Sequence, residues 1–442
     1  MIGCHIGRFF QVTVSGGSYQ EGLAAIIQGH PPGLLLTEQE IYGDLLLRKP
    51  GTDELSSPRK EPDLPIIFTG LNAEDTIENA GNKNHTNGTP LTILIPNLDR
   101  HFEHIKQYQD TNRTPRPGHS SYASFIKYGP DDDAIGAGIF SGRYTCTIVA
   151  AGYIAKKILK KLGIEVFAYV KELASVRCPD TGEKKALEYT QRYKQMKRDL
   201  DPFYQEIYVK GRINPDMRFL EKAKVFAEIE GQIDQIRSCA IKMKPSEIEK
   251  KYDVHHVLNC PDKKAAEEML EAANKITKTG DSSGGIVEVV VTGVPAGLGE
   301  PVFFKLDAEL GRMLGIGAVK GVEIGTGFAV KDMTGSKSND QMSCVNGKVV
   351  FDTNNAGGIT GGLSTGQPII VRLTVKPTPT IDKQQHTIDK YTLENKQLAA
   401  ITRRDPTIVA RIWPVAENYT AIVILDHLIA HYGYQALREK VR

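Results

Sequence analysis

The sequence predicts an α+β fold in which a core of strands and helices is interrupted by a helical insertion. Apolar residues alternate with a period of two over 369–375, which is typical of a half-buried strand. Over 144–162 they recur with helical spacing on one face. Between about 178 and 257 the composition shifts to Lys, Glu, Asp, Gln and Arg. We therefore expect a core formed by 1–177 and 258–442, with 178–257 as an inserted, charge-rich helical arm rather than core.

The other elements follow from the same periodicities, taken in chain order. Strands are predicted at 9–14, 66–69, 91–95, 164–170, 286–292 and from 322 onward. Helices are predicted at 21–29, 37–48, 217–236, 265–277, 306–314 and 416–431. Thr37 and Glu40 form the pattern of a capping box, which sets the start of the second helix. The charged faces of the insertion indicate solvated helices, to which we assign no chemistry.

The bulk composition is that of an ordinary globular protein. The 442 residues carry a formal net charge of +2, with 40% hydrophobic and 24% charged residues. This balance does not indicate a protein that binds nucleic acid or a membrane, and no apolar run has the length of a membrane span. The N-terminus lacks the apolar stretch of a signal peptide, and the six cysteines form no CxxC pair. We expect a cytoplasmic protein with reduced thiols and no metal site.

A glycine-rich stretch at 354–367 is the clearest candidate for a ligand loop. Its five glycines let the backbone approach a ligand closely and turn N–H groups toward an anion. The strand 369–375 follows and ends in Lys376, Pro377 and two threonines. One interpretation is a cradle for a phosphate or a flavin. The other is a hairpin with a glycine-rich bend.

Three further segments carry candidate site residues, each with a plain structural alternative. Ser18 and Tyr19 lie in a Gly-Gly-Ser turn between a predicted strand and a predicted helix, a common place for a site and for an ordinary turn. His119 follows a Pro-Gly bend beside Arg116, which suits a general acid or an anion ligand, although a histidine in a turn is more often simply exposed. The small-residue loop 136–143 precedes a helix, whose N-terminus can bind phosphate; alone, this is a weak signal.

Distinct short motifs are spread along nearly the whole chain. They are Pro31-Pro32-Gly33, Pro50-Gly51-Thr52, Pro58-Arg59-Lys60-Glu61-Pro62-Asp63, Arg116-Pro117-Gly118-His119, Ala150-Ala151-Gly152, Ile154-Ala155-Lys156-Lys157, 293–301, Ala318-Val319-Lys320-Gly321, Ala356-Gly357-Gly358-Ile359, Ser364-Thr365-Gly366-Gln367 and Lys376-Pro377-Thr378. In this order and spacing they resemble the chorismate synthase family, and only the insertion falls largely outside the match. The resemblance implies that family's β-α-β sandwich core.

The resemblance also implies an activity. That family removes phosphate and a ring proton from 5-enolpyruvylshikimate 3-phosphate to give chorismate, in the shikimate pathway of aromatic amino acid biosynthesis. It needs reduced FMN, which lends electron density without net redox change, and it is usually a homotetramer. The expected protein is therefore a flavoprotein lyase with a small-molecule substrate and a homotetrameric or homodimeric assembly.

Individual residues receive roles from the same resemblance. It implies catalytic roles for His119, Asp405, Tyr19 and Ser18, with Asp405 acting at the flavin. It implies contacts with FMN for Ser141, Ala318, Gly361, Lys376, Pro377, Thr378, Thr380 and Arg403. It implies substrate contacts for Arg48, Arg59, Arg143 and Arg404.

The chain departs from the family pattern mainly where the chemistry occurs. Tyr19 and Arg404 stand at positions of family histidines, as does Asn355. Leu47, Glu54 and Ile139 stand at basic positions, and Gly317 replaces an asparagine. Each lost charge-assisted contact to an anion is worth roughly 1.5–3 kcal/mol, and a tyrosine with a reference pKa of about 10 is a poorer proton donor at neutral pH than a histidine. The departures favour a changed, less anionic substrate, for which Phe140 would line an apolar pocket.

Three functions remain open at this point. The first is an FMN-binding lyase that carries out a flavin-assisted elimination on a cyclic, shikimate-like or altered substrate. The second is a divergent chorismate synthase that acts on 5-enolpyruvylshikimate 3-phosphate. The third is a non-catalytic relative whose arm binds a protein partner and can be deleted without unfolding the core.

Overall fold

Two five-stranded antiparallel sheets form the framework of the protein, in a computed structural model that describes residues 2–51, 53–56, 59–99, 112–133, 135–399 and 405–441. The first sheet has the order β1-β2-β3-β5-β4 and comprises His5–Ile6, Gln11–Gly16, Gly22–Gln28, Leu91–Pro96 and Ile66–Thr69. The second has the order β7-β6-β8-β14-β9 and comprises Val176–Arg177, Glu165–Leu173, Gly285–Thr292, Ile369–Val375 and Val319–Ile324.

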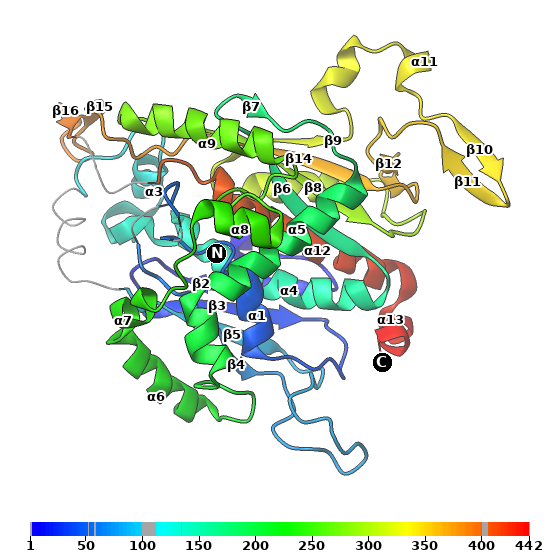
Figure 1. Cartoon of the computed structure of the whole chain (residues 1–442), viewed down its shortest axis with the longest axis horizontal. Coiled ribbons are helices and arrows are strands. Elements are labelled where there is room, and N and C mark those ends of the chain that lie inside the picture. The colour runs from blue at the N-terminus through cyan, green and yellow to red at the C-terminus, as the bar shows by residue number, and fades with distance from the viewer. Residues whose placement is uncertain are drawn as a thin grey trace.

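Two long helices lie between the sheets (Figure 1). Helix α4 (Thr145–Lys161) packs against the first sheet, α12 (Val409–Tyr432) packs against β6 and β8, and the two helices pack on each other. Nearly every residue of α12 is buried, as expected for a helix that is apolar on all sides. This layering confirms the predicted α+β fold with a β-α-β sandwich core.

The remaining helices and hairpins surround this core. The helices are α1 (Glu38–Leu45), α3 (Ser121–Tyr128), α5 (Glu183–Leu200), α6 (Phe219–Glu230), α7 (Ile233–Ser238), α8 (Pro245–Tyr252), α9 (Lys263–Lys278), α10 (Leu306–Gly311), α11 (Gly335–Ser338) and α13 (Tyr434–Val441). The hairpins are β10–β11 (Met342–Val345, Lys348–Phe351), β12–β13 (Ile359–Thr360, Leu363–Ser364) and β15–β16 (Gln385–Ile388, Asn395–Leu398). In the described part of the chain, every helix is too short or too polar to serve as a bilayer span.

The strand 369–375 and the capping box are confirmed. β14 has the predicted bounds and lies between β8 and β9 in the sheet. Thr37 caps α1: its hydroxyl accepts from the N–H of Glu40, and the Glu40 carboxylate accepts from the N–H of Thr37.

The helix predicted at 21–29 is wrong, because this segment forms strand β3. Leu23, Ala25 and Ile27 are buried and alternate with more exposed residues, and β3 pairs with β2 on one side and β5 on the other. The two alanines and the glutamate suggested a helix, but the buried period-two pattern and two pairing partners override local propensity.

The expectation that 178–257 is an arm rather than core also needs correction. The segment is helical, but Tyr189, Tyr193 and Met196 of α5 belong to the main hydrophobic core, and the Tyr193 ring meets Trp413 of α12 edge-on at 6.2 Å. Lys194 binds Glu417 of α12 at 2.6 Å. The charged helices of this segment, which we expected to be solvated, therefore also have one face packed in the core. We expect deletion of the segment to expose part of the hydrophobic core. The domain division itself remains a prediction.

Close packing between α4 and α12 leads to a first prediction, at Gly152. A Cβ at this position would lie 2.3 Å from Asn418 Cβ and 2.5 Å from the Asn418 carbonyl oxygen. We expect Gly152→Ala to lower the free energy of unfolding by about 1–3 kcal/mol through overpacking, measured as a lower Tm. Gly311→Ala is the matched control, because a Cβ there meets nothing within 4 Å; a Gly152→Ala variant as stable as this control would contradict the prediction.

Candidate active site

The turn after β2 holds a guanidinium against two candidate catalytic residues. Ser18 and Tyr19 are buried. The Arg59 Nη1 donates to Ser18 Oγ at 3.2 Å, and its guanidinium lies 5.2 Å from the centre of the Tyr19 ring. The structure thus brings together three residues that the sequence analysis assigned to catalysis or substrate binding.

The small-residue loop 136–143 covers this turn. A Cβ on Gly136 would lie 2.3 Å from the Tyr19 ring, and Gly136 has a φ of +58°. Ser141 Oγ accepts from the N–H of Arg143 at 3.3 Å and so caps a short 3-10 helix. Phe140 is 41% exposed, and its place in an apolar substrate pocket remains a prediction.

Behind the turn lies a buried cluster of arginines and carboxylates. Arg48 and Arg143 are 5% and 4% exposed, and both contact Asp63, which is 0% exposed. Glu61 lies 3.6 Å from Arg143, and burial raises the pKa of Glu61, opposed by Arg143. Because two carboxylates face the two guanidiniums, the cluster offers little net charge to an anionic substrate, and the substrate roles of Arg48 and Arg143 remain predictions.

Asn97 connects the arginine cluster to the turn, and sequence reasoning missed it. Its Oδ1 accepts from Arg143 Nε at 2.8 Å, and its Nδ2 donates to the carbonyls of Gly17 at 2.9 Å and Gln20 at 2.8 Å. A polar residue directly after the Pro96 that ends β5 was the only available signal.

A second, cationic cluster surrounds His119. Arg116 donates to Thr380 Oγ1 at 3.2 Å and lies 3.4 Å from His119 Nε2. The Lys376 ammonium donates to the Gly118 carbonyl. Burial, then Arg116 and Lys376, lower the pKa of His119 to about 3. His119 is therefore neutral at pH 7 and accepts a proton only when an anion offsets these charges.

This depressed pKa gives a pH prediction for His119. The folded protein holds no proton there between pH 6.5 and 3, whereas the unfolded chain does, so stability falls as the pH drops through this window. We expect the Tm of His119→Gln to fall less than that of the unchanged protein between pH 7 and 4.5. Equal losses of Tm would contradict the pKa of His119.

Backbone contacts join several residues assigned to FMN. The N–H of Lys376 donates to the carbonyl of Ala318 at 3.0 Å, and Ala318 has a φ of +72°. Tyr144 Oη accepts from the N–H of Gly317 at 3.0 Å, which ties this segment to the start of α4. Thr378 Oγ1 donates to the Asp405 carbonyl at 2.7 Å.

Arg411, at the start of α12, connects Asp405 to the arginine cluster and was also missed. Its Nη2 binds Asp405 Oδ1, and its Nη1 donates to the carbonyl of Arg48 at 3.3 Å. Two further predicted residues, Arg403 and Arg404, lie outside the described residues.

Gly361, which was also assigned to FMN, lies away from the cluster of His119 and Lys376. With Gly362 it forms the turn between β12 and β13, with φ of +64° and +88°, so the stretch does form a glycine-rich hairpin. This hairpin adjoins the start of β14, whereas Lys376 and Pro377 follow its end, roughly 23 Å away at strand spacing. Figure 1 places β12 beside β10–β11 and β15–β16 on the opposite side. The cradle interpretation for Gly361 remains a prediction.

One group of metal-type ligands occurs among the described residues, in the insertion. Donor atoms of Glu249, His255 and His256 lie within 4.8 Å of one another. However, His255 Nδ1 accepts the N–H groups of Val257 and Leu258 at 3.2 and 3.0 Å. The neutral ring then carries its proton on Nε2, which faces Glu267 at 3.2 Å, so both ring nitrogens are occupied by protein contacts.

Three comparisons with known proteins give the same family over nearly the full length of the chain. The sequence model of the chorismate synthase family matches residues 10–429. A chorismate synthase of Acetivibrio thermocellus is 37% identical and covers 100% of this chain and 98% of its own length, and one of Pyrococcus abyssi is 36% identical, with 96% and 97% covered. A crystal structure of chorismate synthase has a TM-score of 0.64 at 23% identity over 98% of this chain and 97% of its own, which supports the fold. The chain therefore belongs to the chorismate synthase family.

Proposed function

We propose that this chain is a cytoplasmic lyase that uses reduced FMN in an elimination on a cyclic, shikimate-like substrate. Family membership supports an enzyme of this type within the shikimate pathway of aromatic amino acid biosynthesis. The replacement of basic family positions by Leu47, Glu54 and Ile139 favours a substrate with less negative charge than 5-enolpyruvylshikimate 3-phosphate.

The single observation that carries the proposal is uncompensated positive charge around Lys376. Burial, then the nearby Lys320, lower the pKa of Lys376, and no carboxylate pairs with its ammonium in the described parts of the chain. A phosphate dianion would relieve this repulsion, so the residues present fit the phosphate-bearing FMN.

The chain's own residues have distinct tasks in this proposal. Lys376, Thr378 and Thr380 bind the cofactor, and bound reduced flavin supplies electron density to the reacting ring. His119 gains a proton when anions fill the site and then donates it. Ser18, Tyr19 and Arg59, which contact one another, orient the substrate, with Tyr19 Oη as a further proton donor. Asp405, held by Arg411, takes the position of the family carboxylate that acts at the flavin.

A second candidate function is chorismate synthesis from 5-enolpyruvylshikimate 3-phosphate. The observation that favours it is identity of 35–37% over nearly the full length of relatives that carry this name. Phosphate release from this substrate, under reducing conditions with FMN, would establish it in place of an altered substrate.

We also propose a homotetramer or homodimer. The hairpin β10–β11 projects from the body (Figure 1) with Met342, Val345 and Val349 more than half exposed. A two-stranded hairpin is marginally stable by itself, so contact with a second copy would stabilise it. Sedimentation analysis reads the assembly directly, and a strictly monomeric protein would contradict this proposal.

An anaerobic FMN titration with and without dithionite tests the proposed function. We expect binding at micromolar or lower concentration, tighter for reduced FMN, followed by absorbance and fluorescence. Failure to bind in either redox state would overturn the proposal and turn attention to the non-catalytic alternative.

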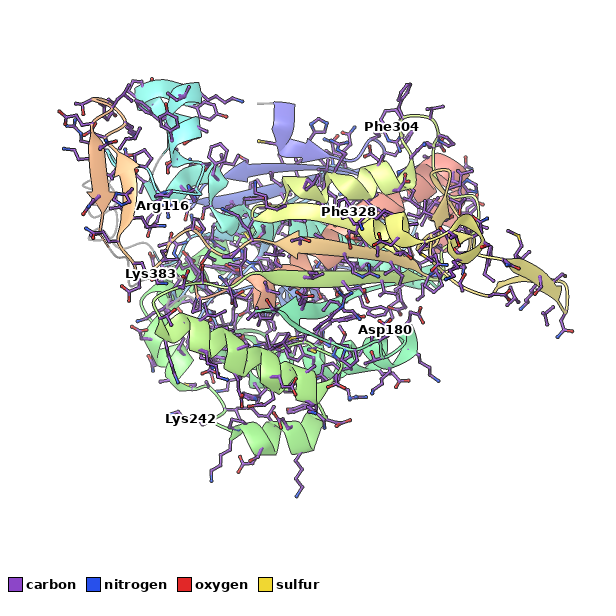
Figure 2. All side chains as sticks on the ribbon, turned by 90° about the horizontal axis from the view of Figure 1, so that it is seen from above. Arg116, Asp180, Lys242, Phe304, Phe328 and Lys383 are labelled. Carbon is purple, nitrogen blue, oxygen red and sulfur yellow. The ribbon has the colours of Figure 1, made fainter. Side chains whose placement is uncertain are left out.

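Replacing Lys376 is expected to damage that binding specifically. Lys376→Gln removes one charge-assisted contact, so the Kd for FMN should rise roughly 10- to 150-fold. Lys242→Gln is a matched control, because Lys242 is an exposed lysine of the insertion, well separated from Arg116 (Figure 2). Equal Kd values for the two variants would show that FMN does not use Lys376.

A further inference from the structure

The insertion leaves and rejoins the core at one edge of strand β6. On leaving, the N–H of Cys178 donates to the Lys171 carbonyl at 2.8 Å. On return, the Asn259 carbonyl accepts from the N–H of Val170 at 2.8 Å, and Asn259 Nδ2 donates to the Ala168 carbonyl at 2.9 Å. Neighbouring positions of β6 therefore hold the two ends of the insertion side by side.

A cysteine stands at each of these ends. Cys178 and Cys260 have reduced, buried thiols. Cys178 Sγ donates to the Pro179 carbonyl at 3.4 Å and Cys260 Sγ donates to the Asp262 carbonyl at 3.5 Å. The neighbouring Cys260 thiol and Lys171 lower the pKa of the Cys178 thiol against the effect of burial, whereas Cys178 and burial raise the pKa of the Cys260 thiol. The lower pKa makes Cys178 the more nucleophilic of the two, and Cys260 is then the thiol that reacts second.

The cover over this pair is thin. Pro179, Asp180 and Gly182 are exposed, and the Asp180 side chain, which binds Lys171 at 2.8 Å, is 96% exposed (Figure 2). Cys178 thus directly precedes an exposed connection between β7 and α5.

We propose that Cys178 and Cys260 are a redox-active pair that closes the base of the insertion as a disulfide. The oxidant is a low-molecular-weight disulfide such as oxidised glutathione. The Cys178 thiolate attacks one of its sulfurs and releases one glutathione thiolate, which takes up a proton. The Cys260 thiol loses its proton and attacks the mixed disulfide at Cys178, releasing the second glutathione. One glutathione disulfide is thus reduced to two thiols as two protein thiols become one disulfide.

The disulfide has a consequence for the candidate active site. Arg237 of α7 donates to the Gly51 carbonyl at 2.8 Å, and Asp234 binds Lys60 at 2.7 Å. Through these contacts the insertion holds the segment that carries Arg59. Closing the base restricts the unfolded chain and holds the insertion in place, so the oxidised protein is the more rigid form.

The test uses the full chain with Cys239 and Cys344, both exposed, replaced by serine so that they form no mixed disulfides. This background protein is incubated with oxidised glutathione under native conditions, digested with trypsin and analysed by mass spectrometry. We expect a Cys178–Cys260 linked peptide, loss of two titratable thiols, a higher Tm and slower amide exchange over 183–252. Reduction with dithiothreitol should reverse all four changes.

Single variants in the same background separate the steps. Cys260→Ser should retain one glutathione on Cys178 and show no rise in Tm, whereas Cys178→Ser should react far more slowly. A background protein that keeps both thiols, or forms the linked peptide only in denaturant, would overturn the proposal. This outcome is independent of FMN binding and does not depend on either serine variant folding.

Discussion

Replacing Glu417 with glutamine is expected to lower the free energy of unfolding by about 3–5 kcal/mol, because it leaves a buried ammonium without its charge partner. Glu417 is 0% exposed in the centre of α12. Its carboxylate binds Lys156 of α4 and Lys194 of α5 and accepts the N–H of Ala168 in β6 at 3.2 Å. One side chain therefore joins two core layers and the insertion.

The two lysines respond differently to this environment. Burial opposes the charge of Lys156, but Asp44 and Glu417 outweigh it and raise the pKa of Lys156. The pKa of Lys194 is lowered, because burial exceeds the effect of Glu417. Without the Glu417 charge, both ammonium groups share Asp44 alone.

Thermal unfolding measures the effect. For 442 residues, about 1 kcal/mol corresponds to roughly 1 °C, so we expect Tm to fall by about 3–5 °C. The deficit should shrink as the pH rises toward 10, because Lys194 then loses its proton. Adding Lys194→Met to Glu417→Gln should recover part of the loss; no recovery would mean that lost packing, rather than unpaired charge, sets the cost.

The core could be read from the sequence where one periodicity dominates. β14 and α4 follow apolar patterns of period two and 3.6, and in each element the apolar positions are the buried ones. The segment 21–29 failed because a short apolar run with two alanines fits either state, and its pairing with β2 and β5 is a long-range fact. The packed face of α5 was hidden by its charges for a similar reason, since its lysines bind acids of the core.

The candidate site was predictable in its residue types but not in its partners. His119, Lys376 and Thr380 were assigned from motifs, and the structure places them in one cluster. The sequence places Arg116 beside His119, but nothing local in it indicates that burial and the distant Lys376 also depress the pKa of His119. The neutralisation of Arg48 likewise depends on Asp63, whose left-handed φ of +58° directs its carboxylate inward and is invisible in a single sequence.

Asp63 is therefore the residue whose neutralisation should cost the most. Asp63→Asn keeps the size of the side chain and tolerates the left-handed backbone, but it removes the charge between Arg48 and Arg143. A guanidinium does not lose its proton in a protein, so the two arginines, unlike Lys194, cannot become neutral when their partner is removed. We expect at least about 3–5 kcal/mol of destabilisation, with Tm lowered by roughly 3–5 °C or more.

The loss should reach the turn that holds Ser18 and Tyr19 as well as the fold. Arg143 positions Asn97, which holds the carbonyls of Gly17 and Gln20, so amide exchange over 17–20 should accelerate in Asp63→Asn. Adding Arg48→Met removes one unpaired guanidinium and should restore part of the stability. If Asp63→Asn unfolds at the same temperature as the unchanged protein, water reaches the arginines, and both would then have charge available for an anionic substrate.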